Sequence, residues 1–153
     1  MLSQRLKQYL DSQNIKYVSI NHSLAFTALE VAESAHVPAE IMAKTVIIKL
    51  NGKLAMAVIP ANAKLDRHHL GDTFGAKDVE LADEADFARA FPDCEVGAMP
   101  PFGNLYDMEV FTAEDLGKHE SVAFNAGSHS EIVKMSYKDY ERLVSPKIIR
   151  LPA

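Results

Sequence analysis

The sequence predicts an α+β fold in which a curved sheet of about six or seven short strands wraps one core and helices lie outside it. The first observation is a series of short apolar runs, rich in β-branched residues, that have the length of strands. The second is Asn51-Gly52, which separates two such runs and is a strong signal for a hairpin. The third is the length of 153 residues, which fits a single domain over residues 1–153.

The first third of the chain is predicted to contain a helix, a strand and a second helix. Apolar residues recur at helical spacing over residues 2–10, and Ser3 is a plausible cap for this helix. Residues 15–20 alternate between apolar and polar side chains and include β-branched ones, which predicts a strand. Thr27 and Glu30 have the spacing of a capping box, so a second helix is expected to follow them.

The middle and the end of the chain supply the remaining strands. Pro38 is expected to begin a short helical turn that continues to residue 42. Residues 44–50 and 53–60 are the predicted hairpin strands. The other predicted elements are a short helix over 66–70, a strand over 79–81, a helix over 83–91 with Ala85, Phe87, Ala88 and Phe91 inward, strands over 108–111, 121–125 and 131–135, a turn over 127–130, a helix over 137–143 and an edge strand over 148–149.

The net charge of −5 hides an uneven distribution of charge. Residues 43–77 contain six basic and two acidic residues, whereas residues 78–120 contain twelve acidic and two basic ones. We therefore do not expect the chain to coat nucleic acid, and DNA is not expected as a partner. The basic middle could contact one or two phosphates, and the alternative is that both regions are ordinary solvated surface.

Several classes of protein and site are not indicated by the sequence. No apolar run approaches the ~20 residues of a membrane span, and the N-terminus lacks an apolar signal-peptide core, so we expect a cytoplasmic protein without a membrane partner. Cys94 is the only cysteine, which excludes an intrachain disulfide. His68 and His69 are neighbours that would point about 100° apart on a helix, so no metal is expected. No nucleophile elbow, phosphate-binding loop or dinucleotide fingerprint is found, and no cofactor is predicted.

A stiff loop over residues 95–103 is the strongest candidate for recognition. Pro100 and Pro101 fix its backbone, and glycines at positions 97 and 103 permit turns at both ends. The N–H groups of residues 97–99, 102 and 103 are expected to face a small polar ligand, and the alternative is an ordinary Pro-Gly turn. Lys44 is interpreted either as a snorkelling residue at a strand end or as a cation facing a phosphate or carbonyl. His129 is either a loop residue or a donor in a pocket.

Four segments in order resemble the YbaK and prolyl-tRNA synthetase editing-domain family. They are His22 with Phe26-Thr27-Ala28-Leu29-Glu30-Val31-Ala32, Ala43-Lys44-Thr45 ahead of Asn51-Gly52-Lys53, Gly97-Ala98-Met99-Pro100-Pro101-Phe102-Gly103, and Asn125-Ala126-Gly127-Ser128-His129. The resemblance covers nearly the whole chain. It implies a mixed, barrel-like sheet surrounded by helices and an aminoacyl-tRNA deacylase, which hydrolyses the ester between a wrong amino acid and the 3′ end of a tRNA.

The resemblance also implies roles for individual residues. The functional lysine of the family matches Lys44, which is the implied catalytic residue, and its Gly-x-x-x-Pro loop matches Gly97 and Pro101. Its second loop, Gly-x-x-His, is only approximated by Gly127 and His129, which are one residue too close. The expected substrate-binding residues are His22, Phe26, Thr27, Thr45, Gly97, Ala98, Met99, Pro101, Phe102, Gly103, Asn125, Gly127, Ser128 and His129.

An aminoacyl ester is already activated, so a positioned water and backbone support for the oxyanion would suffice, without a protein nucleophile. The expected partner is the 3′ end of an aminoacyl-tRNA, held weakly, with help from a synthetase or an elongation factor. Proline tRNA carrying alanine or cysteine is the favoured substrate, with Met99 and Phe102 forming a small slot. The alternatives are a non-catalytic module that docks a tRNA end, a nucleotide or a synthetase, and a hydrolase of another small acyl ester or amide.

Overall fold

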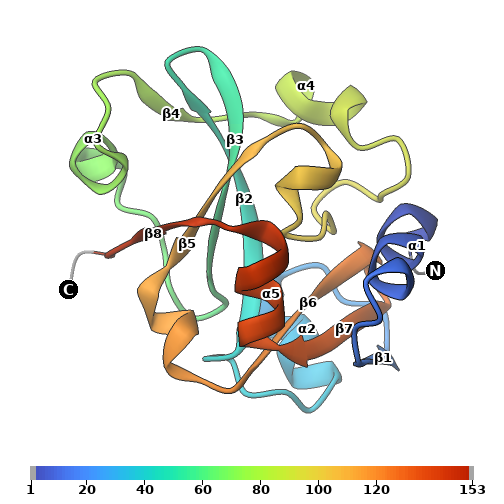
Figure 1. The fold of residues 1–153 in the computed structure, drawn as a ribbon. Helices are drawn as coiled ribbons and strands as arrows, with labels where there is room; N and C mark the ends of the chain where they lie inside the picture. The colour runs from blue at the N-terminus through green and yellow to red at the C-terminus, as the bar shows by residue number, and fades with distance from the viewer. Residues whose placement is uncertain (1–2, 152–153) are drawn as a thin grey trace.

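The computed structural model describes residues 3–151, and its centre is a mixed, curved sheet (Figure 1). Seven strands follow the order β1-β7-β6-β2-β3-β5-β8, and β4 pairs with β2 outside this path as an eighth strand. The predicted α+β class and mixed sheet are confirmed. The strands are β1 Tyr17–Asn21, β2 Met42–Leu50, β3 Lys53–Pro60, β4 Val79–Leu81, β5 Glu109–Ala113, β6 Ser121–Ser128, β7 Glu131–Ser136 and β8 Lys147–Ile149.

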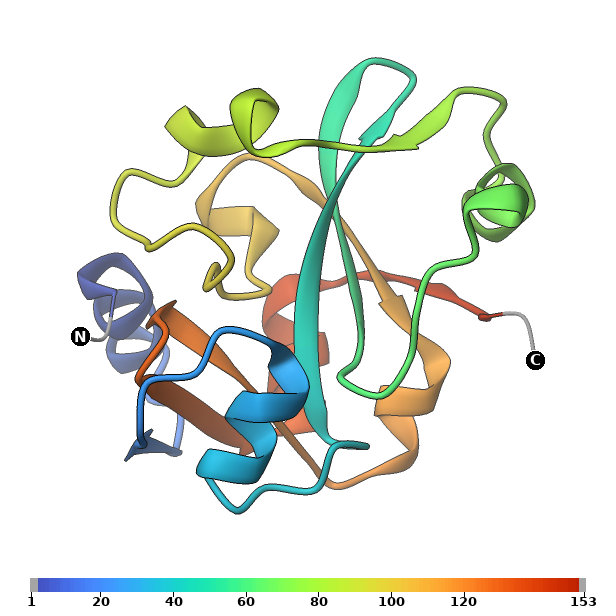
Figure 2. The same ribbon diagram turned by 180° about the vertical axis from the view of Figure 1, so that it is seen from behind.

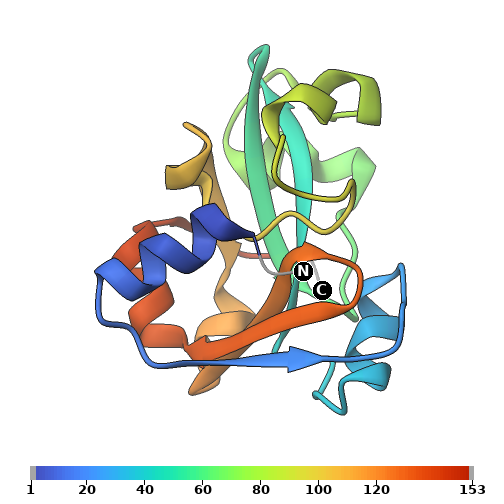
Figure 3. The ribbon, with the colours of Figure 1, turned by 90° about the vertical axis from the view of Figure 1, so that its right-hand side faces the viewer.

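Helices lie on both faces of this sheet. Figures 1 and 2, which view the molecule from opposite sides, show α5 in front of β2 in one view and α2 in front of it in the other. Figure 3 shows α1 and α2 on opposite sides of the β1-β7-β6 part. Among residues 3–151, no helix has the length and apolar character needed to cross a membrane. The α-helices are α1 Gln4–Ser12, α2 Ala28–Ser34, α3 Leu70–Phe74, α4 Glu84–Phe87 and α5 Tyr137–Val144.

Three apolar clusters pack against the sheet. The main core lies between α1, α5 and one face of the sheet, and Phe102 is fully buried within it. The ring centroid of Phe102 lies 5.4 Å from that of Phe124, 5.6 Å from that of Tyr140 and 6.2 Å from that of Tyr9. A second cluster lies under α2 and contains Val31, Ala32, Met42, Ala123 and Ile132. A third cluster includes Leu70 and Phe74 of α3 and Phe111 of β5.

Local sequence signals placed several elements correctly. Asn51 and Gly52 have φ values of +51° and +84°, the left-handed conformations that a tight hairpin turn requires, so the predicted hairpin is confirmed. The capping box is also present, because the Thr27 side chain accepts from the Glu30 N–H and the Glu30 side chain accepts from the Thr27 N–H. The Ser3 side chain caps α1 by accepting from the Leu6 N–H, while residue 2 lies outside the described part of the chain.

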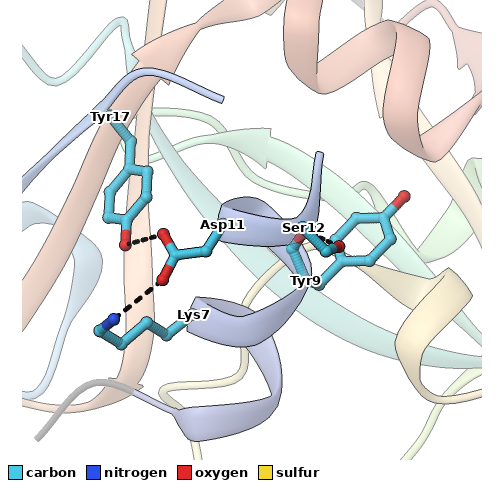
Figure 4. A network of polar contacts seen from close by, with 5 residues as sticks. All are labelled: Lys7, Tyr9, Asp11, Ser12 and Tyr17. Atoms are coloured by element: carbon cyan, nitrogen blue, oxygen red, sulfur yellow. Dashed lines mark hydrogen bonds and ion pairs between the residues drawn. The ribbon is translucent and has the colours of Figure 1, made fainter. Parts of the chain in front are cut away.

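A short polar network ties α1 to β1 (Figure 4). The Lys7 amine lies 2.8 Å from Asp11 Oδ2, and the Tyr17 hydroxyl donates to Asp11 Oδ1 over 3.1 Å. Hydrogen bonds from Lys7 and then Tyr17 lower the pKa of the Asp11 carboxyl. At the end of the helix, the Ser12 hydroxyl donates to the Tyr9 carbonyl over 2.7 Å. All of these groups are solvated, so we assign the network to orientation of the chain rather than to large stabilisation.

Two predicted helical segments are corrected by the structure. Residues 38–41 form a turn in which the Pro38 carbonyl accepts from the N–H groups of Ile41 and Met42, and Met42 already begins β2. Sheet pairing overrides the proline signal because the Met42 carbonyl accepts from Ala61 N–H. The helix predicted over 83–91 is reduced to α4 and a 3₁₀ turn over residues 88–90, which leaves Ala85 and Ala88 exposed.

The segment over residues 126–128 was predicted to lie beyond the strand and partly in a turn, but it belongs to β6. A bulge between Asn125 and Ser128 lets the strand continue, and Gly127 supplies the required left-handed backbone at φ +106°. The hairpin turn is therefore confined to His129 and Ser130. This shift matters for the site, because it places Asn125 within a strand and His129 directly at the strand end.

Candidate functional site

Lys44 is the third residue of β2 and lies on the sheet face covered by α2. Side chains alternate along a strand, so Lys44 shares the face of Met42, which belongs to the cluster under α2. β2 runs parallel to β6, with Met42 opposite Ala123 and Ala43 opposite Phe124. Lys44 and Asn125 each follow the last of these pairs by one residue. Two residues that are far apart in the sequence therefore lie on one face of the sheet, next to the paired positions.

The Lys44 amine is partly desolvated and lacks a compensating anion. Burial lowers the pKa of this amine, and the positive charge of Lys64 lowers it further. Within residues 3–151, no side chain forms a hydrogen bond or ion pair with it. A partly buried charge without a partner is costly to a folded protein, so such a group is typical of a site that an external anion or oxyanion completes.

Asn125 and His129 bring buried hydrogen-bond acceptors to the same region. Each residue is 8% exposed, and the Asn125 Oδ1 and His129 Nδ1 atoms have no partner in the described chain. His129 Nε2 donates to the Val96 carbonyl over 2.7 Å, and a carbonyl only accepts, so Nδ1 of the neutral ring is left as an acceptor. His22 repeats this arrangement, because its Nδ1 donates to the Ser23 carbonyl over 2.8 Å and leaves Nε2 buried and unpartnered.

The loop over residues 95–98 is clamped to the end of β6. The Glu95 carboxylate accepts from the His129 N–H over 2.7 Å, and the Glu95 N–H donates to the Gly127 carbonyl over 2.7 Å. The Gly127 N–H in turn donates to the Ala98 carbonyl over 2.9 Å. Gly97 has φ +87°, and a Cβ there would lie 3.4 Å from His129 Cε1. The two loops implied by the family resemblance therefore form one unit that holds the His129 ring.

Glu95 is a positioning residue that we did not predict as part of the site. Its carboxylate reaches a residue 34 positions later, and no local pattern in the sequence indicates that contact. The only signal in the sequence is an acidic residue at the first position of the glycine-proline loop.

Replacing Glu95 with alanine should loosen His129 and lower any activity of the site by roughly 10²-fold, the cost typical of a misplaced catalytic group. Glu95→Gln keeps an oxygen that can accept from the His129 N–H, so it should retain most of the activity. Rate measurements on both variants test this, with the folded state checked by circular dichroism. Equal losses in the two variants would show that charge, and not the hydrogen bond, is the contribution of Glu95.

Of the other residues predicted to contact the substrate, some lie near His129 and others lie away from Lys44. Phe26 is 65% exposed, and its ring centroid lies 5.0 Å from that of His129. The Thr27 side chain already accepts a hydrogen bond as the cap of α2. Thr45 lies opposite Val58, a residue of the main core, so its side chain is on the face of the sheet away from Lys44. The structure thus brings Phe26 to His129 and separates Thr45 from Lys44.

The second half of the proline loop belongs to the main core. The expectation that Met99 and Phe102 form a small slot for the substrate is therefore corrected. Met99 and Phe102 are members of the core cluster, and Pro101 is buried. A Cβ at Gly103 would lie 2.3 Å from the Met108 carbonyl oxygen, so this glycine permits close packing. The expectation that several N–H groups of this loop face a ligand is corrected as well. The Ala98 N–H donates to the Glu95 carbonyl, and the Gly97 N–H donates to Met99 Sδ.

Lys44 lines none of the three cavities that we describe. They have volumes of about 850, 740 and 290 Å³, and the smallest adjoins Glu95 and Gly127. Lys44 thus occupies a half-buried position on the sheet face. Among residues 3–151, no cluster of three or more histidine, cysteine or acidic residues could hold a metal.

Cys94 lies in the chain just ahead of the loop and is the residue that most resembles a nucleophile. Burial raises the pKa of its thiol to about 11, and Tyr106 hydrogen-bonds to it over 3.3 Å. The reactive form of cysteine is the thiolate, which is scarce at neutral pH when the pKa is so high. Cys94 is therefore a structural residue next to the loop and not an activated nucleophile.

Comparison with known proteins identifies the family. The family model described as the aminoacyl-tRNA editing domain matches residues 22–143, which span both loops and Lys44. The chain belongs to the aminoacyl-tRNA editing domain family. It is thereby a member of the aminoacyl-tRNA deacylases, which hydrolyse aminoacyl-tRNA esters. The predicted family and enzyme class are confirmed.

Two curated relatives and one solved structure cover nearly the whole editing domain. The multifunctional Ser/Thr-tRNA deacylase ProXp-y of Escherichia coli (strain K12) is 24% identical over 95% of this chain and 90% of the relative. The prolyl-tRNA editing protein ProX of Acetoanaerobium sticklandii is 27% identical over 88% of this chain and 85% of its own length. A crystal structure of a candidate trans-editing enzyme for prolyl tRNA synthetase, 18% identical, covers 99% of this chain and 96% of that chain with a TM-score of 0.80, which shows the shared fold.

Proposed function

We propose that this protein is a free-standing deacylase that acts in trans and releases a wrong amino acid from proline tRNA. The observation that carries the proposal is Lys44, a partly buried amine without a counter-ion that lies on the same sheet face as Asn125. Hydrolysis of an ester develops negative charge on the carbonyl oxygen, and a preorganised cation in a partly desolvated position stabilises that charge. Lys44 is the residue that we propose as catalytic.

The proposed reaction uses water as the nucleophile. The buried acceptors Asn125 Oδ1 and His129 Nδ1 would bind donors of the substrate, which are its ammonium and hydroxyl groups. The Gly97 N–H has only a thioether sulfur as partner, 3.2 Å away, and sulfur is a weak acceptor. This N–H would lose only a weak hydrogen bond to Met99 Sδ if it donated to the oxyanion instead. Lys44 and one backbone donor would then share the developing charge, in place of the row of N–H groups expected from the sequence.

The favoured substrates are proline tRNAs that carry alanine or cysteine. The relative named as a prolyl-tRNA editing protein supports the choice of tRNA, whereas the relative named as a Ser/Thr-tRNA deacylase makes seryl and threonyl esters the competing substrates. Neighbouring amino acids that differ by one methylene are separated by only about 1–3 kcal/mol in a pocket. We include in this proposal that a synthetase or an elongation factor presents the tRNA, because the net charge of −5 limits non-specific attraction.

A panel of aminoacyl-tRNAs tests the proposal. Proline tRNA carrying alanine, cysteine or proline, and the cognate tRNAs carrying serine or threonine, would be incubated with the protein and the remaining ester measured over time. We expect the alanyl or cysteinyl ester on proline tRNA to be released faster than in buffer, while prolyl-tRNA is spared. An ester that hydrolyses more slowly with the protein than without it would identify a docking module. Faster release confined to the seryl or threonyl esters would overturn the substrate choice.

A further inference from the structure

A basic groove lies at the other end of β6 and β7 from His129. It has a volume of about 850 Å³ and is formed by the start of β1, the ends of β7 and β6 that face α5, and the segment that precedes β6. Lys16, Lys118, Lys134 and Lys138 line it together with His119, whereas Glu120 and Asp139 are its acidic residues. None of these residues was singled out in the sequence analysis, because they come from three separate segments, residues 16–18, 117–121 and 134–139.

The charges that remain unpaired in this groove are mainly positive. Asp139 lies 3.3 Å from Arg142, and Lys118 lies 3.3 Å from Asp115, so these two are already paired. Lys16, Lys134 and Lys138 form no ion pair with any residue of the described chain. Three free ammonium groups against one carboxylate give a local positive field on a chain whose net charge is −5. Such a field favours binding of a polyanion over binding of a neutral ligand.

The basic residues in the middle of the sequence lie apart from this groove. Lys49 lies 2.7 Å from Asp86, so part of its charge is neutralised by the acidic region that follows. Lys53 and Lys77 are exposed on the hairpin and near β4, away from the groove. Lys64 and Arg67 remain exposed, and Lys64 is close enough to Lys44 to lower the pKa of its amine, so the phosphate contact expected of residues 43–77 stays a prediction beside the groove.

The groove lies along β6 from Asn125, a residue that we propose as a substrate contact. Ser121 lines the groove and lies four residues before Asn125 on β6. With a rise of ~3.3 Å per strand residue, the two are on the order of 13 Å apart. This separation is short compared with the length of a tRNA strand, so one strand can reach the groove while its end lies near Asn125.

We propose that this groove binds backbone phosphates of the tRNA acceptor strand a few nucleotides from the 3′ end, while the terminal ester lies at Lys44. This inference rests on the proposed function for its substrate. It adds a second contact surface, in which Lys16 and Lys138 are phosphate ligands and not catalytic residues. The groove accounts for how an acidic protein holds tRNA near its end.

The test compares two double variants that remove the same charge. Lys16→Ala with Lys138→Ala removes two groove lysines, and Lys53→Ala with Lys77→Ala removes two exposed lysines elsewhere. Binding of uncharged tRNA would be followed by fluorescence anisotropy at several salt concentrations. We expect the groove variant to bind about 5- to 10-fold more weakly and its salt slope to fall by about 1.5, whereas the control variant stays close to wild type.

A deacylation assay separates the two proposals. With full-length aminoacyl-tRNA, the groove variant should show a raised KM and an unchanged kcat, and a short aminoacyl-nucleotide ester should be hydrolysed at the wild-type rate. If wild type hydrolyses no ester but the groove variant still loses tRNA binding, the groove is supported and the deacylase proposal fails. Equal binding losses in both double variants, or no loss in the groove variant, would overturn the groove.

Discussion

Replacing Lys44 with methionine is expected to lower the deacylation rate by about 10²- to 10³-fold, the loss typical of removing one group that stabilises an oxyanion. Methionine has a similar length and fits beside Met42, so the sheet should not be disturbed. The loss should be found mainly in kcat, because the amine is proposed to interact most strongly with charge that develops in the transition state.

The same substitution should not destabilise the fold. Burial first, and then Lys64, lower the pKa of the Lys44 amine below its ordinary 10.5. In the pH range between the lowered value and 10.5, the unfolded chain therefore binds more protons than the folded one, and stability rises with pH through that range. At neutral pH the charge thus costs stability, and methionine removes this cost. The melting temperature of Lys44→Met should equal or exceed that of wild type.

Lys53→Met is the matched control, since it removes an exposed lysine from the start of β3. Initial rates with the ester that wild type hydrolyses, together with thermal melts followed by circular dichroism, decide the outcome. Wild-type rates in Lys44→Met would remove Lys44 from the catalytic role. A lowered melting temperature with lost activity would instead indicate that Lys44 supports the fold.

Replacing Phe102 with alanine should lower the free energy of unfolding by about 3–5 kcal/mol, the range for a large aromatic residue in a packed core. Phe102 is fully buried and contacts the rings of Tyr9, Phe124 and Tyr140. These rings come from α1, β6 and α5, so the cavity would lie where three elements meet. A typical domain has only about 5–15 kcal/mol of stability in total, so the variant is expected to be close to unfolding at 37 °C.

Phe26→Ala is the matched control for this prediction. Its ring is 65% exposed, so its removal should change stability by no more than about 0.5 kcal/mol. Equilibrium unfolding in urea gives both values, and the slopes of the transitions show whether the two variants unfold in the same way. Similar losses for Phe26→Ala and Phe102→Ala would contradict the assignment of Phe102 to the core and restore its place as a ligand contact.

Elements with a strong local signal were predicted well. The hairpin at Asn51-Gly52 and the capping box of Thr27 and Glu30 depend on backbone conformations and hydrogen bonds within a few residues. Elements whose form depends on distant partners were predicted less well. The segment after Pro38 pairs with the sheet instead of forming a helical turn, and β6 continues through a bulge at Gly127. In both cases pairing with another strand outweighed the local preference.

The sequence by itself determined the fold class, the family, and the identity of Lys44 and the two glycine-containing loops as candidates. It could not determine which of them face each other. Parallel pairing of β2 and β6 ends one residue before Lys44 and Asn125 and puts both on one face of the sheet, a carboxylate at Glu95 holds His129, and Phe102 turns into the core. The physical reason is that side chains alternate between the two faces of a sheet, so the register of strands distant in the chain decides which residues meet. That register arises from packing of the whole domain and has no local signature.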